Sequence, residues 1–527
     1  MVPRDITKML TDILQIADTK SLLELVRNIE LKGVAAGESQ EAHGVQELNV
    51  VVEAVQLLLD LHGEPQRRYH CTCLLQDYIW EKLNTGHWKE VKREWRDLYA
   101  LISLIRISCV VELRLKFTTL CRDKTRYSGK RKRTSDHNNV IGPGSEPNNL
   151  ASNPGDSIDL ESGDQCQSET EPSIRKELAK IVPATEPKFE QDPNPGPGPD
   201  HEPYLAQGSG LTISMEKDDI ELIEELVRIA DMGLLLGAPI HNNAQERIAE
   251  ILTEFLAQDL CSLPSKISFK NEKEFTLEKV AIHLPEPCKP FRPVPDCLEP
   301  SIEEFVADFM VPGHPVVLTG CMSDWPAMSE ARRWGPTRLV ALAGPRTVPV
   351  ELGRNYTHAH WTQKLMTVRE FAEKYLVDDP SEVGYLAQHQ LLDQVPQLGD
   401  DVCIPDYCYT GEDEDVDINV WIGPGGTVSP LHTDPKHNLL CQVSGTKYVV
   451  LYPVNESKNL YPHSSPLLFN TSQVDLQEPN LDLYPGFSNT QGYHTLLRPG
   501  EMLYIPPGVW HFVTSLSTSF SVSFWWK

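Results

Sequence analysis

The chain is 527 residues long, is 40% hydrophobic and carries a formal net charge of −27 at pH 7. That length and composition allow more than one domain with a sizeable core, and the acidic charge argues against nucleic-acid binding through the bulk of the surface. The sequence has neither an apolar run of about 20 residues nor a secretory signal, so we expect no membrane span and no secretion. The 12 cysteines show no repeated spacing, which indicates reduced thiols in an intracellular protein.

The first part of the chain, residues 1–121, is predicted to be helical. Apolar side chains recur at helical spacing over residues 45–61 and again over residues 88–120. Packing of helices against one another explains both stripes, so no cofactor is needed to account for them.

A segment of different composition follows. Residues 122–210 are rich in Ser, Asn, Pro, Gly and acids, so they cannot bury enough apolar area to offset their ordering entropy. We therefore expect a disordered insert, whose basic cluster Lys130–Arg133 is either a nuclear import signal or a solvated charge run. Residues 211–285 return to helical spacing and are expected to complete the same N-terminal domain and lead out of it.

The pattern in residues 286–527 indicates strands. The final strand alternates strictly, with Phe520, Val522, Phe524 and Trp526 on one face and Ser519, Ser521, Ser523 and Trp525 on the other. Two apolar runs around Ser444 and Gly445 predict a hairpin. The chain is thus expected to be a multidomain α + β protein, with an α-helical domain before a β-rich one.

A candidate metal site lies in this β-rich part. His432 and Asp434 form a His-x-Asp pair on an extended segment, which places both side chains on one face of a strand. His511, far along the chain, can complete a set of three ligands. Two His and one carboxylate suit non-haem iron(II) and leave three coordination positions open. Taken alone the pair also fits a surface loop or a satisfied polar pair, but the strands and Gly/Pro turns around it favour a site.

Lys447 interrupts the second apolar run of the predicted hairpin. It is either an edge lysine that discourages aggregation or an inward lysine. A buried ammonium needs an anionic partner, because an unpaired buried charge is very costly. A dicarboxylate cosubstrate would supply that partner.

His432-x-Asp434, Lys447, His511 and the segment Asp324-Trp325-Pro326-Ala327 resemble the Jumonji-C family of Fe(II)- and 2-oxoglutarate-dependent oxygenases. The resemblance implies a double-stranded β-helix, a jelly-roll of the cupin-like kind, over residues 286–527. It implies Fe(II) held by the metal triplet, 2-oxoglutarate as cosubstrate, and O₂. By the resemblance, the residues that bind the cosubstrate are Tyr385, Ser429, Asn438 and Lys447, and those that bind the substrate are Glu351, Trp361, Gln388 and Trp421.

The resemblance suggests two chemistries, hydroxylation at C3 of an arginyl residue and removal of a methyl group from a histone lysine. We favour arginyl hydroxylation, because the carboxylate of Glu351 can accept a guanidinium fork and the ring of Trp361 can stack on it. A methyl-lysine site would more usually be an aromatic cage. A histone-tail peptidase and a non-enzymatic chromatin-binding module are further alternatives, since fold does not decide function.

The expected partners are protein or peptide substrates that bear arginine, histone tails among them. The N-terminal helices are expected to bind another protein, and the catalytic domain is expected to bind neither nucleic acid nor membrane. The resemblance implies a role in chromatin, transcription and cell-cycle regulation, with the nucleus as the expected location and the cytoplasm as a second compartment.

Overall fold

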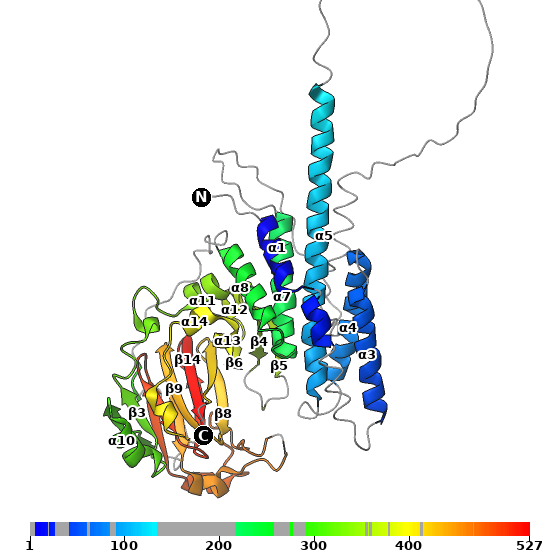
Figure 1. Cartoon of the computed structure of the whole chain (residues 1–527). Coiled ribbons are helices and arrows are strands. Elements are labelled where there is room, and N and C mark those ends of the chain that lie inside the picture. The colour runs from blue at the N-terminus through cyan, green and yellow to red at the C-terminus, as the bar shows by residue number, and fades with distance from the viewer. Residues whose placement is uncertain are drawn as a thin grey trace, which may run out of the picture.

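The computed structural model describes residues 6–18, 20–26, 42–60, 64–84, 91–133, 217–257, 275–277, 291–353, 357, 361–377, 380–411, 415–466 and 468–527. In these ranges a group of helices comes first and a domain built on two β-sheets follows (Figure 1). The expected fold class, an N-terminal helical domain followed by a β-rich jelly-roll, is therefore confirmed. None of the helices in these ranges is long and apolar enough to cross a lipid bilayer.

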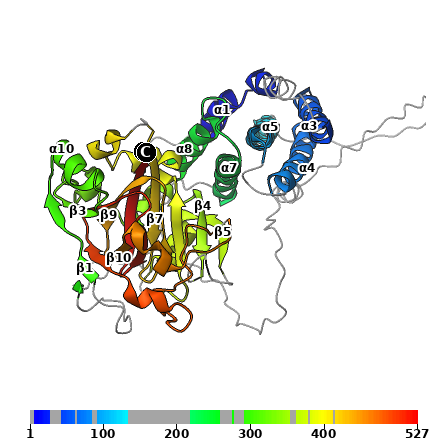
Figure 2. The same ribbon diagram turned by 90° about the horizontal axis from the view of Figure 1, so that it is seen from below.

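The N-terminal domain packs around one long helix. Its helices are α1 (Ile6–Ile16), α3 (Ala42–Asp60), α4 (Pro65–Leu83), α5 (Arg93–Arg133), α7 (Lys217–Leu236) and α8 (Ala244–Ala257). Seen end-on, α5 lies in the middle, with α1, α3, α4 and α7 around it (Figure 2). This position explains the apolar stripe predicted after residue 88, because a helix with neighbours on several sides buries several of its faces.

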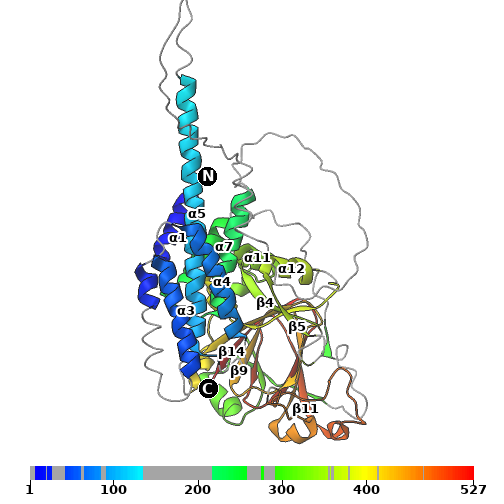
Figure 3. The same cartoon turned by 90° about the vertical axis from the view of Figure 1, so that its right-hand side faces the viewer.

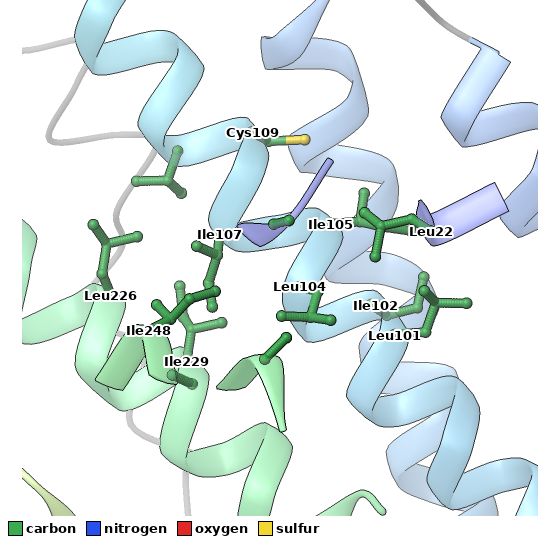
Figure 4. Packing of buried hydrophobic residues seen from close by; sticks show 14 of the residues in the cluster. Leu22, Leu101, Ile102, Leu104, Ile105, Ile107, Cys109, Leu226, Ile229 and Ile248 are labelled. Carbon is green, nitrogen blue, oxygen red and sulfur yellow. The ribbon is translucent and has the colours of Figure 1, made fainter. Parts of the chain in front are cut away.

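The core of the helical domain joins segments from both ends of the predicted insert. Leu104 and Ile105 of α5 are fully buried, as are Leu226 and Ile229 of α7 and Ile248 of α8, and Figure 4 shows these side chains gathered in one cluster. Two ion pairs lie beside this core, Arg106 Nη2 to Glu225 Oε1 at 3.3 Å and Arg114 Nη2 to Asp219 Oδ1 at 2.5 Å. The helices before and after the insert thus share one domain.

The helix α5 extends further than the sequence predicted. We expected the insert to begin at residue 122, whereas α5 continues to Arg133. Residues 122–133 contain no proline and several Lys and Arg, so a helix nucleated by the buried stretch before them can propagate through them. The basic cluster Lys130–Arg133 is consequently the end of a helix. The rest of the predicted insert, residues 134–210, lies outside the described residues.

The β-rich domain has short helices beside its strands. The strands are β1 (Phe291–Pro293), β2 (Asp296–Leu298), β3 (Val316–Thr319), β4 (Thr347–Leu352), β5 (Thr362–Thr367), β6 (Gly384–His389), β7 (Asp417–Gly423), β8 (Val428–His432), β9 (His437–Ser444), β10 (Lys447–Tyr452), β11 (Gly492–Leu497), β12 (Met502–Ile505), β13 (Trp510–Ser515) and β14 (Ser519–Trp526). The helices are α10 (Ile302–Phe305), α11 (Pro336–Ala343), α12 (Val368–Tyr375), α13 (Leu391–Gln394) and α14 (Pro396–Gly399). Single turns occur at η2 (Val306–Met310), η3 (Pro326–Met328), η4 (Asp406–Thr410), η5 (Val454–Leu460) and η6 (Pro485–Asn489).

Two sheets face each other in this domain. The larger has the order β2-β3-β12-β9-β14-β7-β6-β4-β5 and the smaller has the order β1-β11-β10-β13-β8. Leu440 and Leu503 of the larger sheet pack with Val449 and Val513 of the smaller one, which forms the layer between the sheets. The outer face of the larger sheet is covered by α11 and α12, which Figure 3 shows close to β4.

The alternation predicted for the last strand is present in β14. Phe520, Val522, Phe524 and Trp526 are buried in the cluster beneath the helices. The serines point the other way, and Ser523 accepts a hydrogen bond from Trp421 Nε1 at 2.8 Å on the inner face. One face of β14 therefore packs in the core and the other lines the space between the sheets.

The hairpin predicted at Ser444 and Gly445 is wrong. β9 pairs with β12 and β14 in the larger sheet, whereas β10 pairs with β11 and β13 in the smaller one. The turn therefore carries the chain from one sheet to the other. Gly445 has a φ of 74° and sits so close to Thr518 that an added Cβ would lie 2.1 Å from its carbonyl oxygen, so the position requires glycine.

Candidate metal centre and cosubstrate pocket

The structure brings the three predicted metal ligands together. His432 ends β8 and His511 lies at the start of β13, and these two residues are paired in the antiparallel register. Asp434 follows two residues after His432. One ligand atom from each lies within 4.8 Å of the others, with His511 Nε2 3.5 Å and His432 Nε2 4.0 Å from Asp434 Oδ2.

Backbone carbonyls fix the orientation of both imidazole rings. His432 Nδ1 donates to the carbonyl of Pro430 at 2.7 Å, and His511 Nδ1 donates to the carbonyl of Val509 at 3.1 Å. A ring protonated at Nδ1 presents the lone pair of Nε2, which is the atom that faces Asp434 in each case. The rings are thus held in the tautomer that a metal requires.

The turn that carries Asp434 is also tied down. The carbonyl of Asp434 accepts from the amide of Gly508 at 2.8 Å, next to the strand of the distal histidine. Between the ligands, Thr433 is held twice by Asn470: its amide donates to the Asn470 carbonyl at 2.9 Å, and its carbonyl accepts from Asn470 Nδ2 at 2.9 Å. The carboxylate therefore sits on a segment braced from two sides.

Burial prepares the distal histidine for a cation. It lowers the pKa of His511 to about 4, and the neighbouring His432 acts in the same direction, while Asp434 opposes it. His511 is therefore neutral near pH 7, with a free lone pair. Two neutral imidazole nitrogens and one carboxylate oxygen are the donor set that suits non-haem iron(II), so the residues present fit that metal.

The ammonium of Lys447 lies deep between the sheets. Its side chain is 1% exposed, on a strand flanked by β11 and β13, so it is not an edge lysine. Nζ donates to the hydroxyl of Tyr385 at 3.4 Å and lies 5.7 Å from the centre of that ring. Burial lowers the pKa of Lys447 to about 7, and no carboxylate in the described part of the chain offsets it. This is the inward lysine that the sequence proposed, and it fits an anionic ligand.

Two further polar groups of the predicted cosubstrate set support the same interpretation. Ser429 hydrogen-bonds the phenol of Tyr385, whose pKa is raised by burial. Asn438, on β9, is buried, and its Oδ1 has no hydrogen-bond partner among the described residues. Such a group costs free energy unless a ligand pairs with it. The roles of Tyr385, Ser429, Asn438 and Lys447 in holding 2-oxoglutarate remain predictions, which this geometry fits.

Of the predicted substrate residues, Glu351 contacts Trp361, Trp421 lies near Tyr385, and Gln388 is exposed. Glu351 Oε2 accepts from Trp361 Nε1 at 3.2 Å, and burial raises the pKa of Glu351 in spite of that bond. Trp421 lies with its ring centre 6.0 Å from that of Tyr385. Gln388 is exposed and has a φ of 47°, at an irregularity in the pairing of β6 with β7. The substrate roles of all these residues remain predictions.

Tyr385 links the cosubstrate residues to Glu351. The two residues are partners in the pairing of β4 with β6, and the charge of Glu351 raises the pKa of the phenol. The same tyrosine contacts Lys447, so it lies near both a carboxylate predicted to bind substrate and an ammonium predicted to bind cosubstrate.

Two residues near the site were not predicted as functional. Asn470 braces the turn between the ligands. It lies far from Thr433 in the sequence, and no spacing pattern links the two residues. Trp525 lies on the inner face of β14, and its indole N–H is buried without a partner among the described residues. The alternation of β14 already placed Trp525 on that face, so the signal for it was present in the sequence.

The chain is similar in sequence to known proteins. Residues 302–527 match the family model described as a Cupin-like domain. The chain is 45% identical over 310 residues to "Lysine-specific demethylase 8" of Danio rerio, which covers 58% of this chain and 75% of that protein. It is 40% identical over 347 residues to the protein of the same name from Xenopus tropicalis, covering 58% and 78%. It is 43% identical over 242 residues to "Jumonji C domain-containing protein 5" of Drosophila melanogaster, covering 44% and 60%.

These similarities confirm the family that the sequence resembled and the enzyme class that goes with it, a 2-oxoglutarate-dependent dioxygenase. The metal triplet and the buried lysine lie within the matched region, as do all strands of the two sheets except β1 and β2. The chain belongs to the Jumonji-C family of cupin-like, 2-oxoglutarate-dependent oxygenases.

Proposed function

We propose that this enzyme is a protein demethylase that acts on methylated lysine side chains. The sequence alone favoured arginyl hydroxylation, but two of the relatives above carry the name of a lysine-specific demethylase, which favours the alternative. The observation in this chain that carries the proposal is the half-buried carboxylate of Glu351 against the indole of Trp361. A carboxylate and aromatic rings together suit a methylated ammonium, which combines one positive charge with an apolar surface.

The hydrogen bond from Trp361 bears on the choice of cation. It occupies one side of Oε2, so a ligand reaches Oε1 more freely than both oxygens at once. A methylammonium with a single N–H needs only one oxygen, whereas a guanidinium fork uses both. The rings of Trp421 and Tyr385, 6.0 Å apart, add apolar surface beside this position.

Hydroxylation at C3 of an arginyl residue is the second candidate. The raised pKa of Glu351 shows a carboxylate taken out of water, and a guanidinium is the cation that compensates such burial best. Glu351 Oε2 can still share its second lone pair with an incoming N–H. The same carboxylate therefore supports both chemistries, and the product decides between them.

Each part of the site has a distinct task in either reaction. Bound iron(II) and 2-oxoglutarate supply the oxidation of a substrate C–H bond by O₂. His432, Asp434 and His511 hold the metal, and the carbonyls of Pro430 and Val509 keep both imidazoles in the required tautomer. Lys447 binds the far carboxylate of the cosubstrate, with Tyr385 beside it.

Glu351 and Trp361 would position the cationic substrate for the oxidation that the bound metal and cosubstrate would supply. The rings and strands around them keep water from the reaction.

One experiment separates the candidates. The full chain with Fe(II), 2-oxoglutarate and ascorbate is incubated with two matched peptide panels, one bearing methylated lysine and one bearing arginine at the same positions. Loss of a methyl group with release of formaldehyde supports demethylation. Gain of one oxygen atom on arginine, with intact methyl-lysine peptides, overturns it in favour of the hydroxylase.

We further propose that the enzyme works in the nucleus on chromatin proteins. The basic cluster Lys130–Arg133 at the end of α5 is the feature that supports this. Replacing its four residues with alanine in a fluorescent fusion tests it, because the fusion should then shift to the cytoplasm. An unchanged nuclear signal would remove this support.

A further inference from the structure

One carboxylate of the helical domain is buried where this domain contacts the catalytic domain. Asp231 lies on α7 and is 0% exposed. Its Oδ1 accepts from Arg346 Nε at 2.9 Å, Arg346 Nη2 at 2.7 Å and Gln394 Nε2 at 2.9 Å, and its Oδ2 accepts from the amide of Thr347 at 2.6 Å. Four donors from the β-rich domain thus converge on one acid from the helical domain, where α7 runs beside β4 (Figures 1 and 3).

Stability alone does not explain such a group. Arg346 is 1% exposed, so both charges have been removed from water. A buried ion pair gains little over apolar residues of the same volume, because desolvation offsets the attraction. What the pair does provide is a single geometry, since its donors are satisfied in one arrangement only. This geometry holds two elements of the catalytic domain.

The first element is the strand that carries Glu351. Arg346 directly precedes β4, and Thr347 is its first residue, so the acid grips this strand at its beginning. Glu351 lies four residues further, about 13 Å along an extended chain. At that point β4 pairs with β6, with Glu351 opposite Tyr385. The strand anchored on Asp231 therefore bears one residue of the substrate pair and backs the tyrosine that contacts Lys447.

The second element is the other end of β6. Gln394 Nε2 donates both to Asp231 and, at 2.8 Å, to the carbonyl of Thr347, so its Oε1 must face the other way. His389 Nε2 lies 2.7 Å from that oxygen and is its donor. His389 ends β6, just after the left-handed Gln388 and the irregular pairing with β7. Through Gln394, Asp231 also holds the strand of Tyr385 where its regular pairing is lost.

We propose that Asp231 is a positioning residue: the helical domain, through this one carboxylate, sets the placement of β4 and β6 and with them Glu351 and Tyr385. The effect of Asp231 on substrate binding rests on the proposed function, which assigns Glu351 to the substrate. Its effect on cosubstrate binding rests only on the family, because Tyr385 contacts the lysine of the cosubstrate pocket. The helical domain therefore helps to determine the geometry of the active site.

The test replaces Asp231 with Asn in the full chain, which keeps the volume and removes the charge. Binding of 2-oxoglutarate is titrated with Mn(II) in place of Fe(II), and hydrogen–deuterium exchange is followed in residues 347–352 and 384–389. We expect the dissociation constant of 2-oxoglutarate to rise about fivefold or more and exchange in both segments to accelerate, with β8 and β13 unchanged. With a peptide substrate, KM should rise more than kcat falls.

Two control variants separate positioning from loss of stability. Asp401 is another fully buried carboxylate, held within the catalytic domain by Trp334 Nε1 at 3.0 Å, Arg338 Nε at 2.7 Å and Arg332 Nε at 2.5 Å, so Asp401→Asn removes the ion pairs of a buried acid elsewhere. Gln397→Ala removes an interdomain bond, from Gln397 Nε2 to Glu250 Oε1 at 2.9 Å, that does not reach β4 or β6. Both should leave cosubstrate affinity within twofold of wild type.

A milder variant serves if Asp231→Asn does not fold. Gln394→Leu keeps the ion pair and the bond from the amide of Thr347 but breaks the link to His389 and one bond to the carbonyl of Thr347, so exchange should accelerate more in residues 384–389 than in residues 347–352. Unchanged exchange and cosubstrate affinity in both variants, with lowered Tm alone, would overturn the proposal. These two readouts need no peptide, so they stay decisive even if neither demethylation nor arginyl hydroxylation is found.

Discussion

Lys447 Nζ lies 3.4 Å from the hydroxyl of Tyr385, and the charge of Glu351 raises the pKa of the same tyrosine. Replacing Lys447 with Ala removes the cation that the predicted cosubstrate needs. A hydrogen bond between charged groups is worth about 1.5–3 kcal/mol, so the 2-oxoglutarate requirement should rise about 10- to 100-fold. A titration of succinate formation measures it, with the exposed Lys458→Ala as control. Unchanged dependence would mean that this lysine does not bind the cosubstrate.

Cosubstrate binding should depend on pH through the same residue. In the free protein burial lowers the pKa of Lys447 to about 7, from 10.5, whereas binding a dianion requires the charged form. Above pH 7 binding must therefore take up a proton, and affinity should fall about fivefold between pH 7 and pH 8 and little below pH 6. Calorimetry in two buffers of different ionisation enthalpy detects the proton. Lys447→Arg, charged throughout, should flatten the profile.

The stability of the ligand-free protein should respond in the opposite direction. Between pH 7 and pH 10.5 the unfolded chain binds a proton at Lys447 that the folded chain does not. The contribution of Lys447 to the free energy of unfolding therefore increases as the pH rises from 7 to 10.5. The gain in Tm caused by 2-oxoglutarate should accordingly shrink from pH 7 to pH 9. A constant ligand-induced shift over this range would contradict the assigned pKa.

The metal triplet should be separable from the fold. His432→Ala and Asp434→Ala are expected to abolish iron binding and turnover with only a small change in Tm, because these side chains are partly exposed and face the space between the sheets. Iron content after desalting and succinate release measure the two effects. The exposed His314→Ala is the matched control. Wild-type succinate release from either ligand variant would refute the metal site.

Asn470 should matter to the metal without touching it. It braces Thr433 between two ligands by two hydrogen bonds of 2.9 Å, and loss of such supporting contacts typically costs about 10- to 100-fold in metal affinity. Asn470→Ala should therefore weaken iron binding at least tenfold at nearly constant Tm. Asn480→Ala, in an exposed turn, should not. Equal iron affinity in both variants would show that the turn at Thr433 keeps its geometry without Asn470.

Glu351→Gln tests how the substrate is recognised. The amide has the same shape but no charge, so KM for a cationic peptide should rise about 10- to 100-fold while 2-oxoglutarate affinity stays within twofold. If the substrate is a methyl-lysine, the loss should appear with methyl-lysine peptides, and arginine in that position should already be poor. Glu373→Gln, exposed on α12, is the control. An unchanged KM would remove Glu351 from the substrate pocket.

The fold and the metal site could be predicted because their signals are local or repeated. Alternation in β14 and helical spacing in α5 follow from the periods of strand and helix. The His-x-Asp spacing predicted that His432 and Asp434 would lie together, although β8 ends at His432 and Asp434 lies on the turn that follows. The hairpin predicted at Gly445 was wrong, because two apolar runs around Ser-Gly give the same sequence pattern whether the two strands pair with each other or belong to opposite sheets.

Asp231 could not be predicted at all. An acid within an amphipathic helix is usually solvated, and its partner Arg346 lies 115 residues away. No pattern of spacing connects the two. The length of α5 was missed for a related reason, since tertiary burial in its first half sustains a helix whose last residues alone would not predict one.

The convergence of four donors on Asp231 has a consequence for the ancestry of this enzyme. A lineage that kept the cupin-like domain but lost the helices would leave the guanidinium of Arg346, the amide of Thr347 and the side chain of Gln394 without the acid that holds them in one arrangement. Such a lineage would have to hold β4 with another acid or would no longer need the arginine. Among relatives, Asp231 and Arg346 should therefore be inherited or lost together.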